Sequence, residues 1–167
     1  MMVSNDDATE IDVPHWFEIA AEIKQIYTPK SANVENGLGD SEDKKKYVVL
    51  LTSGNEDGGK RATLAFSAAC TAISMDFDTV VFLMGEGSHW AYEGACNSVV
   101  QLGFPPLAEL LDSFLSLGGR IYSCAACDEA ANGLKRMHGE RKRRHNIQTL
   151  GLAPVLTHLV DSTSVTF

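Results

Sequence analysis

The sequence lacks any long apolar run. Its 167 residues contain no stretch of the roughly 20 consecutive apolar side chains that a membrane-spanning helix needs. Residues 1–10, MMVSNDDATE, have neither a basic head nor an apolar core, so they do not predict a secretory signal. We therefore expect a cytoplasmic protein without a membrane span. In that compartment cysteines are usually thiols rather than structural disulfides, and the sequence has four: Cys70, Cys96, Cys124 and Cys127.

An excess of basic residues is also missing. The formal net charge is −8 at pH 7, and residues 1–43 carry all of it, with ten acidic and two basic side chains. From residue 44 onward acids and bases balance at twelve each. Because nucleic-acid-binding domains need a positive surface, we expect no nucleic-acid partner. The one basic run, KRMHGERKRR at residues 135–144, is interpreted as a solvated face, or as a docking surface for an acidic partner or for the chain's own acidic segment.

The acidic segment and the rest of the chain differ in pattern, which predicts two parts. Within residues 12–27 apolar side chains recur at helical spacing, whereas residues 31–46 are polar, contain glycine and show no periodicity. We therefore expect an acidic N-terminal extension at residues 1–43, made of one helix and a linker, followed by a domain at residues 44–167. The helix is expected to pack on its own domain or on a neighbouring subunit.

Strand and helix patterns alternate after the linker. Short apolar runs predict strands, and longer segments with helical start and stop signals predict helices. The expected strands are 47–52, 79–84, 120–124, 146–151 and 164–167; the expected helices are 60–75, 105–119, 128–138 and 153–161, with a short helical stretch after the glycine-rich loop GEGSHWAYEG. This alternation predicts an α/β fold with three layers, α/β/α, around a mainly parallel sheet of about five strands.

The first strand-to-helix loop imitates a phosphate-binding loop. In LLTSGNEDGGKR, residues 50–61, two glycines and Lys60 stand at the spacing G-x-x-x-x-G-K. However, Arg61 replaces the hydroxyl residue that would hold magnesium, and two acidic residues inside the loop would repel a polyphosphate. We therefore expect no nucleotide hydrolysis, and we expect Asp57 to cap the helix that follows.

The ends of the first three strands predict where a site would lie. Ligands of open parallel sheets bind beyond the carboxyl ends of the strands. We therefore expect a substrate pocket at this edge, lined by Thr52, Ser53, Gly54, Gly85, Gly87, His89 and Trp90. For His89, a position in a solvated loop is an equal alternative to a place in this pocket.

Cysteine chemistry is expected at the end of the third strand. Cys124 ends RIYSC just before a helix, whose amides favour a thiolate, although two carboxylates that follow act against it. Cys127 completes a C-x-x-C pair and is suited to resolve an oxidised Cys124. One such pair supplies only two of the four ligands of a tetrahedral zinc site, so we expect no metal. Cys70 and Cys96 are interpreted as structural thiols.

Several of these segments together resemble one family. YVVLLTSGNED, TVVFLMGEG, the double glycine before RIYSCAAC, and the final SVTF follow one another as in the DsrE/DsrF-like sulfur-relay family, over roughly residues 46–167. The resemblance implies an α/β/α domain in which Cys124 carries sulfane sulfur as a persulfide and hands it to a partner, without an organic cofactor. It also implies a homo-oligomer, either a trimer or a hexamer. Cys127 stands where many members have a small residue, so the resemblance leaves open whether the two cysteines act together.

The favoured function is therefore a sulfurtransferase-like persulfide carrier that exchanges sulfur with donor and acceptor proteins. Two alternatives remain. One is a small-molecule or nucleotide-binding regulatory module that uses the loop around Lys60. The other is a thiol-disulfide oxidoreductase that uses Cys124 and Cys127.

Overall fold

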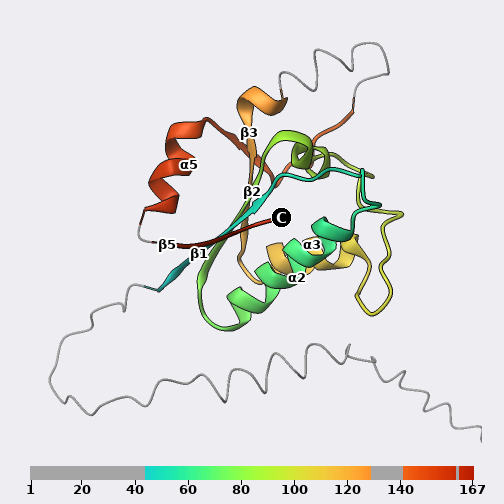
Figure 1. Ribbon diagram of the computed structural model, residues 1–167, viewed down its shortest axis with the longest axis horizontal. Helices are drawn as coiled ribbons and strands as arrows, with labels where there is room; N and C mark the ends of the chain where they lie inside the picture. The colour runs from blue at the N-terminus through green and yellow to red at the C-terminus, as the bar shows by residue number, and fades with distance from the viewer. Residues whose placement is uncertain (1–43, 129–140, 161) are drawn as a thin grey trace, which may run out of the picture.

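The computed structural model describes residues 44–128, 141–160 and 162–167 (Figure 1). The acidic extension, with its expected helix and linker, lies outside these residues. So do residues 129–140, which include most of the helix expected at 128–138. The described residues belong to the expected α/β domain.

One five-stranded sheet forms the centre of this domain. The order across the sheet is β4-β3-β2-β1-β5, and every neighbouring pair is parallel. The carboxyl ends of the strands therefore meet at one edge. We call the part of this edge formed by residues 52–54, 84–90 and 124–128 the rim. The strands are β1 (Lys46–Leu51), β2 (Asp78–Leu83), β3 (Arg120–Cys124), β4 (Gln148–Leu150) and β5 (Ser162–Thr166).

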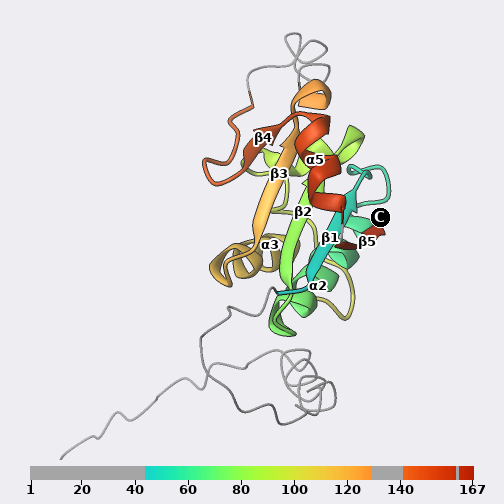
Figure 2. The ribbon, with the colours of Figure 1, turned by 90° about the vertical axis from the view of Figure 1, so that its left-hand side faces the viewer.

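Helices cover both faces of the sheet. The helices α2 (Lys60–Ser74) and α3 (Leu107–Ser116) pack on one face, and α5 (Leu152–Leu159) packs on the other (Figures 1 and 2). Because side chains alternate along a strand, Val49 of β1 joins the core under α2 and α3, whereas Val48 joins the core under α5. The expected three-layer α/β/α arrangement is confirmed.

The face under α2 and α3 holds the larger core. Phe66 of α2 and Phe114 of α3 are fully buried, and their rings meet edge to face with centroids 6.2 Å apart. Burying one such ring contributes roughly 1.5–3 kcal/mol. On the other face, Val155 is the one buried residue of α5. The sheet is therefore anchored mainly by α2 and α3, and the α5 face is more thinly covered.

The strands and helices of the described residues occur in the expected order and differ from expectation mainly at their ends. One expectation was wrong: the helical stretch predicted to follow GEGSHWAYEG. The loop itself coils into a 3-10 helix, η1 (Gly85–Ala91), and residues 93–98 form turns. Two glycines explain the difference. Gly87 lets the loop pack against the backbone at the end of β1, and Gly94 has a φ of 79°, which interrupts a right-handed helix.

Candidate functional site

Hydrogen bonds join the three loops of the rim. The N–H of Gly87 donates to the carbonyl of Thr52 at 3.0 Å, which connects the loops after β1 and β2. The N–H of Gly85 donates to Sγ of Cys127 at 3.2 Å, which connects the loop after β2 with the turn after β3. Residues that were expected at the carboxyl ends of three different strands therefore lie together.

Two glycines allow this close approach. A Cβ atom at Gly87 would lie 2.0 Å from the carbonyl oxygen of Leu51, and one at Gly54 would lie 2.9 Å from the carbonyl oxygen of Glu86. Backbone atoms cannot yield to such contacts as a flexible side chain can. Because glycine has no Cβ atom, both residues allow the loops of the rim to pack directly against each other's backbone.

The other side chains expected to line a pocket have separate surroundings. Trp90 is fully buried, and its indole N–H donates to the carbonyl of Ser53 at 2.9 Å, so this side chain belongs to the core. The hydroxyl of Thr52 donates to the carbonyl of Phe167 at 2.8 Å. Nδ1 of His89 lies 3.1 Å from Nη1 of Arg141. These contacts hold the loops of the rim in place.

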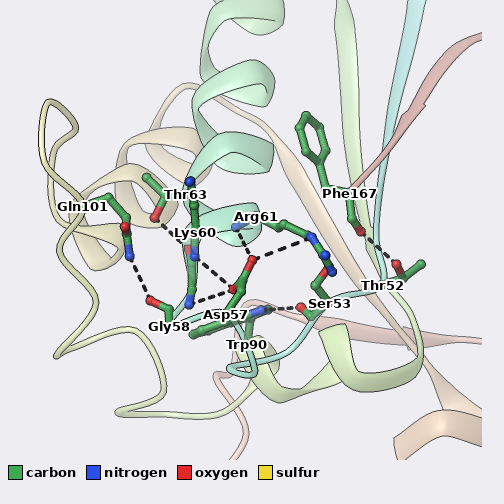
Figure 3. A network of polar contacts seen from close by, with 11 residues as sticks. Thr52, Ser53, Asp57, Gly58, Lys60, Arg61, Thr63, Trp90, Gln101 and Phe167 are labelled. Atoms are coloured by element: carbon green, nitrogen blue, oxygen red, sulfur yellow. Dashed lines mark hydrogen bonds and ion pairs between the residues drawn. The ribbon is translucent and has the colours of Figure 1, made fainter.

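The loop that imitates a phosphate-binding loop is filled by its own carboxylate (Figure 3). Oδ1 of Asp57 accepts the N–H groups of Gly59 and Lys60 at 3.0 and 3.1 Å, and Oδ2 accepts the N–H of Arg61 at 3.0 Å. These are the free N–H groups at the start of α2 that a phosphate would need. The expected cap is confirmed. The carboxylate of Asp57 lies where the phosphate of a bound ligand would accept these N–H groups.

A cavity of about 220 Å³ opens beside the start of α2. Neither Cys124 nor Cys127 belongs to its lining, so it is separate from the thiols of the rim. Its lining mixes one ammonium group, two uncharged polar side chains and three apolar ones: Lys60, Thr63, Leu64, Gln101, Leu102 and Phe104.

Cys124 and Cys127 form a pair at the rim. Cys124 is the last residue of β3, and residues 125–128 are helical. The backbone N–H of Cys127 lies 3.4 Å from Sγ of Cys124, and the two Sγ atoms are 2.7 Å apart with the Cys127 thiol as donor. Both side chains are half-buried. The pair is therefore partly open to solvent and close enough for exchange between its own sulfur atoms.

The surroundings of Cys127 favour the protonated form of its thiol. Burial raises the pKa of the Cys127 thiol above its ordinary value, and the hydrogen bond to Cys124 raises it further. The N–H of Gly85 lowers this pKa, and the charge of Asp128 raises it. A protonated Cys127 is able to donate the hydrogen bond to Cys124, and such a bond stabilises negative charge on the sulfur that accepts it.

A buried carboxylate holds the turn that carries Cys127. Asp128 is 2% exposed. It lies 2.7 Å from the guanidinium of Arg143 and accepts hydrogen bonds from the hydroxyls of Ser123 at 2.9 Å and Tyr92 at 3.3 Å. These partners come from β3, from the residue after η1 and from the segment that precedes β4. Asp128 therefore ties three parts of the chain to the turn that contains the cysteine pair.

The described part of the basic run is paired within the chain. Backbone hydrogen bonds join this segment to the residues after η1, with Glu93 N–H donating to the carbonyl of Lys142 at 2.8 Å. The interpretation as a solvated face or a docking surface is wrong for Arg143 and Arg144, whose side chains are 27% and 16% exposed and form ion pairs. Lys135 and Arg136 lie outside the described residues. The pairs are Arg141 over the ring of Tyr92, Lys142 with Glu93, Arg143 with Asp128, and Arg144 with Asp112.

The other two cysteines are core residues, as expected. Cys70 is fully buried and Cys96 is 1% exposed. Burial raises the pKa of Cys70 to about 12 and that of Cys96 to about 11. Neither thiol is suited to exchange with a partner.

Sequence reasoning did not assign a site role to Asp128, Arg143 or the N–H of Gly85. The sequence does contain an indication for Asp128, because this charged residue follows Cys127 in a stretch of small residues. If such a residue is buried, its charge needs a partner. Arg143 has no such signal because it is one of several bases in succession. The N–H of Gly85 is a backbone group that no residue pattern singles out.

Within residues 44–128, 141–160 and 162–167, no group of three or more histidine, cysteine or acidic side chains is arranged to hold a metal ion. In the same ranges no helix combines the length and the apolar character needed to cross a bilayer.

Comparisons with known proteins agree with this fold. The model of the DsrE/DsrF-like family matches residues 45–136, more than half of the chain. An uncharacterized protein of Methanocaldococcus jannaschii is 33% identical over 79 residues, which cover 47% of this chain and 28% of that protein. The chain thus spans less than a third of that relative's length. The crystal structure of the ychN protein from E. coli superposes with a TM-score of 0.55 at 12% identity, over 74% of this chain and 99% of that one, which shows a shared fold.

Proposed function

Because the chain belongs to the DsrE/DsrF-like family, we propose that it is a sulfur carrier. Cys124 accepts sulfane sulfur as a persulfide and passes it to a thiol of a partner protein. The substrates are therefore protein-bound sulfane sulfur on the donor side and a protein thiol on the acceptor side.

The observation that carries this proposal is the position of Cys124. It ends a central strand at the rim, where parallel sheets bind their ligands, and it is half-buried, whereas Cys70 and Cys96 lie in the core. Its sulfur accepts a hydrogen bond from the Cys127 thiol and lies 3.4 Å from the backbone N–H of Cys127. Both contacts stabilise a sulfur anion, which is the attacking and the leaving species in thiol exchange.

The transfer consists of two displacements. The thiolate of Cys124 attacks the outer sulfur of a donor persulfide, a new S–S bond forms, and the donor's inner sulfur leaves as a thiolate. An acceptor thiolate then attacks the outer sulfur on Cys124, and Cys124 leaves as a thiolate. One S–S bond forms and one breaks in each step, so no external oxidant or reductant is needed.

Mass spectrometry of the intact protein tests the proposal. After incubation with inorganic polysulfide and removal of the excess, we expect a gain of about 32 Da per sulfur atom, the mass of sulfur itself, located on Cys124 by peptide analysis. Cys124→Ser should lose this gain, and the matched variant Cys96→Ala should keep it. Equal sulfur uptake by Cys124→Ser would reject the carrier role of this residue.

The proposal extends to assembly and location. We propose a cytoplasmic homo-oligomer, a trimer or a hexamer, whose subunits each contain an acidic extension at residues 1–43 and a DsrE-like domain at residues 44–167. A stripe of exposed apolar side chains on and just after α5 supports association: Leu152, Leu156 and Val160 are 57%, 56% and 61% exposed and follow one another at helical spacing.

Sedimentation velocity tests the assembly. Leu156→Asp should shift the protein toward monomer, while Thr157→Asp, an exposed neighbour on the same helix, should leave the oligomer intact. A parent protein that sediments only as a monomer at micromolar concentration contradicts the assembly but leaves the chemistry of Cys124 unaffected.

A further inference from the structure

We propose that Cys127 discharges the persulfide on Cys124, which releases hydrosulfide and leaves an internal disulfide. The domain would then have two outlets for its sulfur: transfer to a partner, and reductive release as sulfide. This inference rests on the proposed function, because it requires a persulfide on Cys124.

The geometry of the two sulfur atoms carries the inference. A persulfide has two sulfur atoms, and the inner one is Sγ of Cys124 itself. Sγ of Cys127 lies 2.7 Å from that atom. A partner protein approaches from outside and meets the outer sulfur, whereas Cys127 is already beside the inner one. The two nucleophiles therefore lead to different products.

The step balances without an outside reagent. The thiolate of Cys127 attacks the inner sulfur, the Sγ–Sγ bond forms, and the S–S bond of the persulfide breaks. The outer sulfur leaves with the electron pair of that bond as hydrosulfide. The sulfane sulfur is reduced to sulfide, the two cysteine sulfurs are oxidised to a disulfide, and the proton of the Cys127 thiol goes to solvent.

A fixed backbone group assists the attacking sulfur. The N–H of Gly85 points to Sγ of Cys127 at 3.2 Å and stabilises negative charge there. Gly85 has a φ of 54°, and the loop that contains it is held on β1 by the bond from Gly87 N–H to the carbonyl of Thr52, at 3.0 Å. This donor is therefore in place before the reaction begins, and it serves Cys127 specifically.

The surroundings of Cys127 also explain why discharge would not outrun delivery. Burial and the neighbouring charge of Asp128 keep the thiol protonated near neutral pH, so only a small fraction is ready to attack. The charged group that opposes ionisation is in turn fixed by Arg143 and by the hydroxyls of Ser123 and Tyr92. A loaded Cys124 should therefore release sulfide slowly when no acceptor is bound.

A reductant of the dithiol class completes the cycle. One of its thiolates attacks the disulfide to form a mixed disulfide, its second thiolate displaces the protein, and Cys124 and Cys127 return as thiols while the dithiol is oxidised. Cys70 and Cys96 cannot replace Cys127 in this role, because both are buried in the core.

The test follows sulfide and protein mass together, with the full chain. Reduced protein is loaded with inorganic polysulfide, freed of excess reagent, and incubated without acceptor. In the parent protein we expect the form that is heavier by about 32 Da to disappear, a form lighter than the reduced protein by about 2 Da to appear, and sulfide to be released in equal amount. Dithiothreitol should restore the reduced mass. In Cys127→Ser the loaded form should persist, with sulfide release slower by at least about tenfold, and Cys96→Ala should behave as the parent.

The outcomes separate this inference from the carrier role. If the parent gains no sulfur on Cys124, the proposed function fails. If it gains sulfur and Cys127→Ser releases sulfide as fast as the parent, the carrier role stands and the role of Cys127 is rejected. If sulfur is instead found on Cys127 and no disulfide forms, Cys127 is a second carrier site, which also overturns the inference.

Discussion

The carboxylate of Asp128 lies 2.7 Å from the guanidinium of Arg143, although the two residues belong to separate segments of the chain. Asp128 directly follows Cys127, and Arg143 belongs to the segment that precedes β4. The aspartate side chain is 3% exposed and the arginine side chain is 27% exposed. The pair therefore links the turn of the cysteines to a segment that also pairs with the residues after η1.

Replacing one member of this pair should strongly destabilise the fold. Asp128→Asn keeps the shape but leaves the guanidinium of Arg143 without its counter-charge, and breaking a partly buried pair in this way costs about 3–5 kcal/mol. Urea denaturation should show the loss as a lower midpoint. Lys142→Gln is the matched control, since its pair with Glu93 is exposed and such pairs contribute about 0–1 kcal/mol. An unchanged midpoint in Asp128→Asn would mean that the pair does not anchor the turn.

The pH dependence of alkylation should report the raised pKa of Cys127. Iodoacetamide reacts with the thiolate, so at a pH near the ordinary cysteine value Cys127 should react more slowly than a cysteine in an unstructured peptide. Its rate should rise only as the pH passes the raised pKa. In Cys124→Ala the hydrogen bond is lost, so the midpoint should fall, while burial keeps part of the elevation.

Peptide mass spectrometry measures this rate at Cys127 alone. Sulfide release from the loaded protein should accelerate over the same pH range, because the same thiolate is the attacking group. A Cys127 midpoint at or below that of the unstructured peptide contradicts the expectation. Cys96→Ala should leave the midpoint unchanged.

The order of strands and helices in the described domain was predictable because apolar runs and glycine or proline signals are local in sequence. Cys124 was predictable as a rim residue for the same reason, since it ends an apolar strand just before a helix. Asp128 and Arg143 were not, because their pairing depends on how separate segments meet in three dimensions. The coiling of η1 was also missed, since it follows from packing of Gly87 against the end of β1.

Gly87→Ala should disturb the rim far more than alanine at another glycine. The added Cβ would lie 2.0 Å from the carbonyl oxygen of Leu51, so the loop after β2 has to move away from β1. We expect a loss of more than about 2 kcal/mol in the free energy of unfolding, and slower sulfide release from the loaded protein, because the N–H of Gly85 that donates to Sγ of Cys127 moves with the loop. Gly151→Ala is the control, since no atom lies within 4 Å of its added Cβ. Equal stability of the two variants in urea would contradict this account.

Asp57→Ala should destabilise the start of α2 without creating a nucleotide site. The substitution removes the acceptor of three backbone N–H groups, those of Gly59, Lys60 and Arg61. The loss of a helix cap costs roughly 0.5–2 kcal/mol, and urea denaturation should show a change of that size. Lys60→Ala serves as the control. In this variant the three N–H groups still donate to the carboxylate of Asp57, so the free energy of unfolding should stay close to that of the parent.

The freed N–H groups would be open to an anion, but the chemistry of a phosphate-binding loop would still be incomplete. Arg61 occupies the position of the hydroxyl that would hold magnesium, and β2 ends at Leu83 without the aspartate that would assist it. ATP hydrolysis should therefore stay at background in the parent and in Asp57→Ala, measured as phosphate release with magnesium present. Magnesium-dependent turnover that Lys60→Ala abolishes would show that the loop binds nucleotide after all. The absence of turnover, together with the loss of stability in Asp57→Ala alone, would show that this carboxylate takes the place of a phosphate in a purely structural loop.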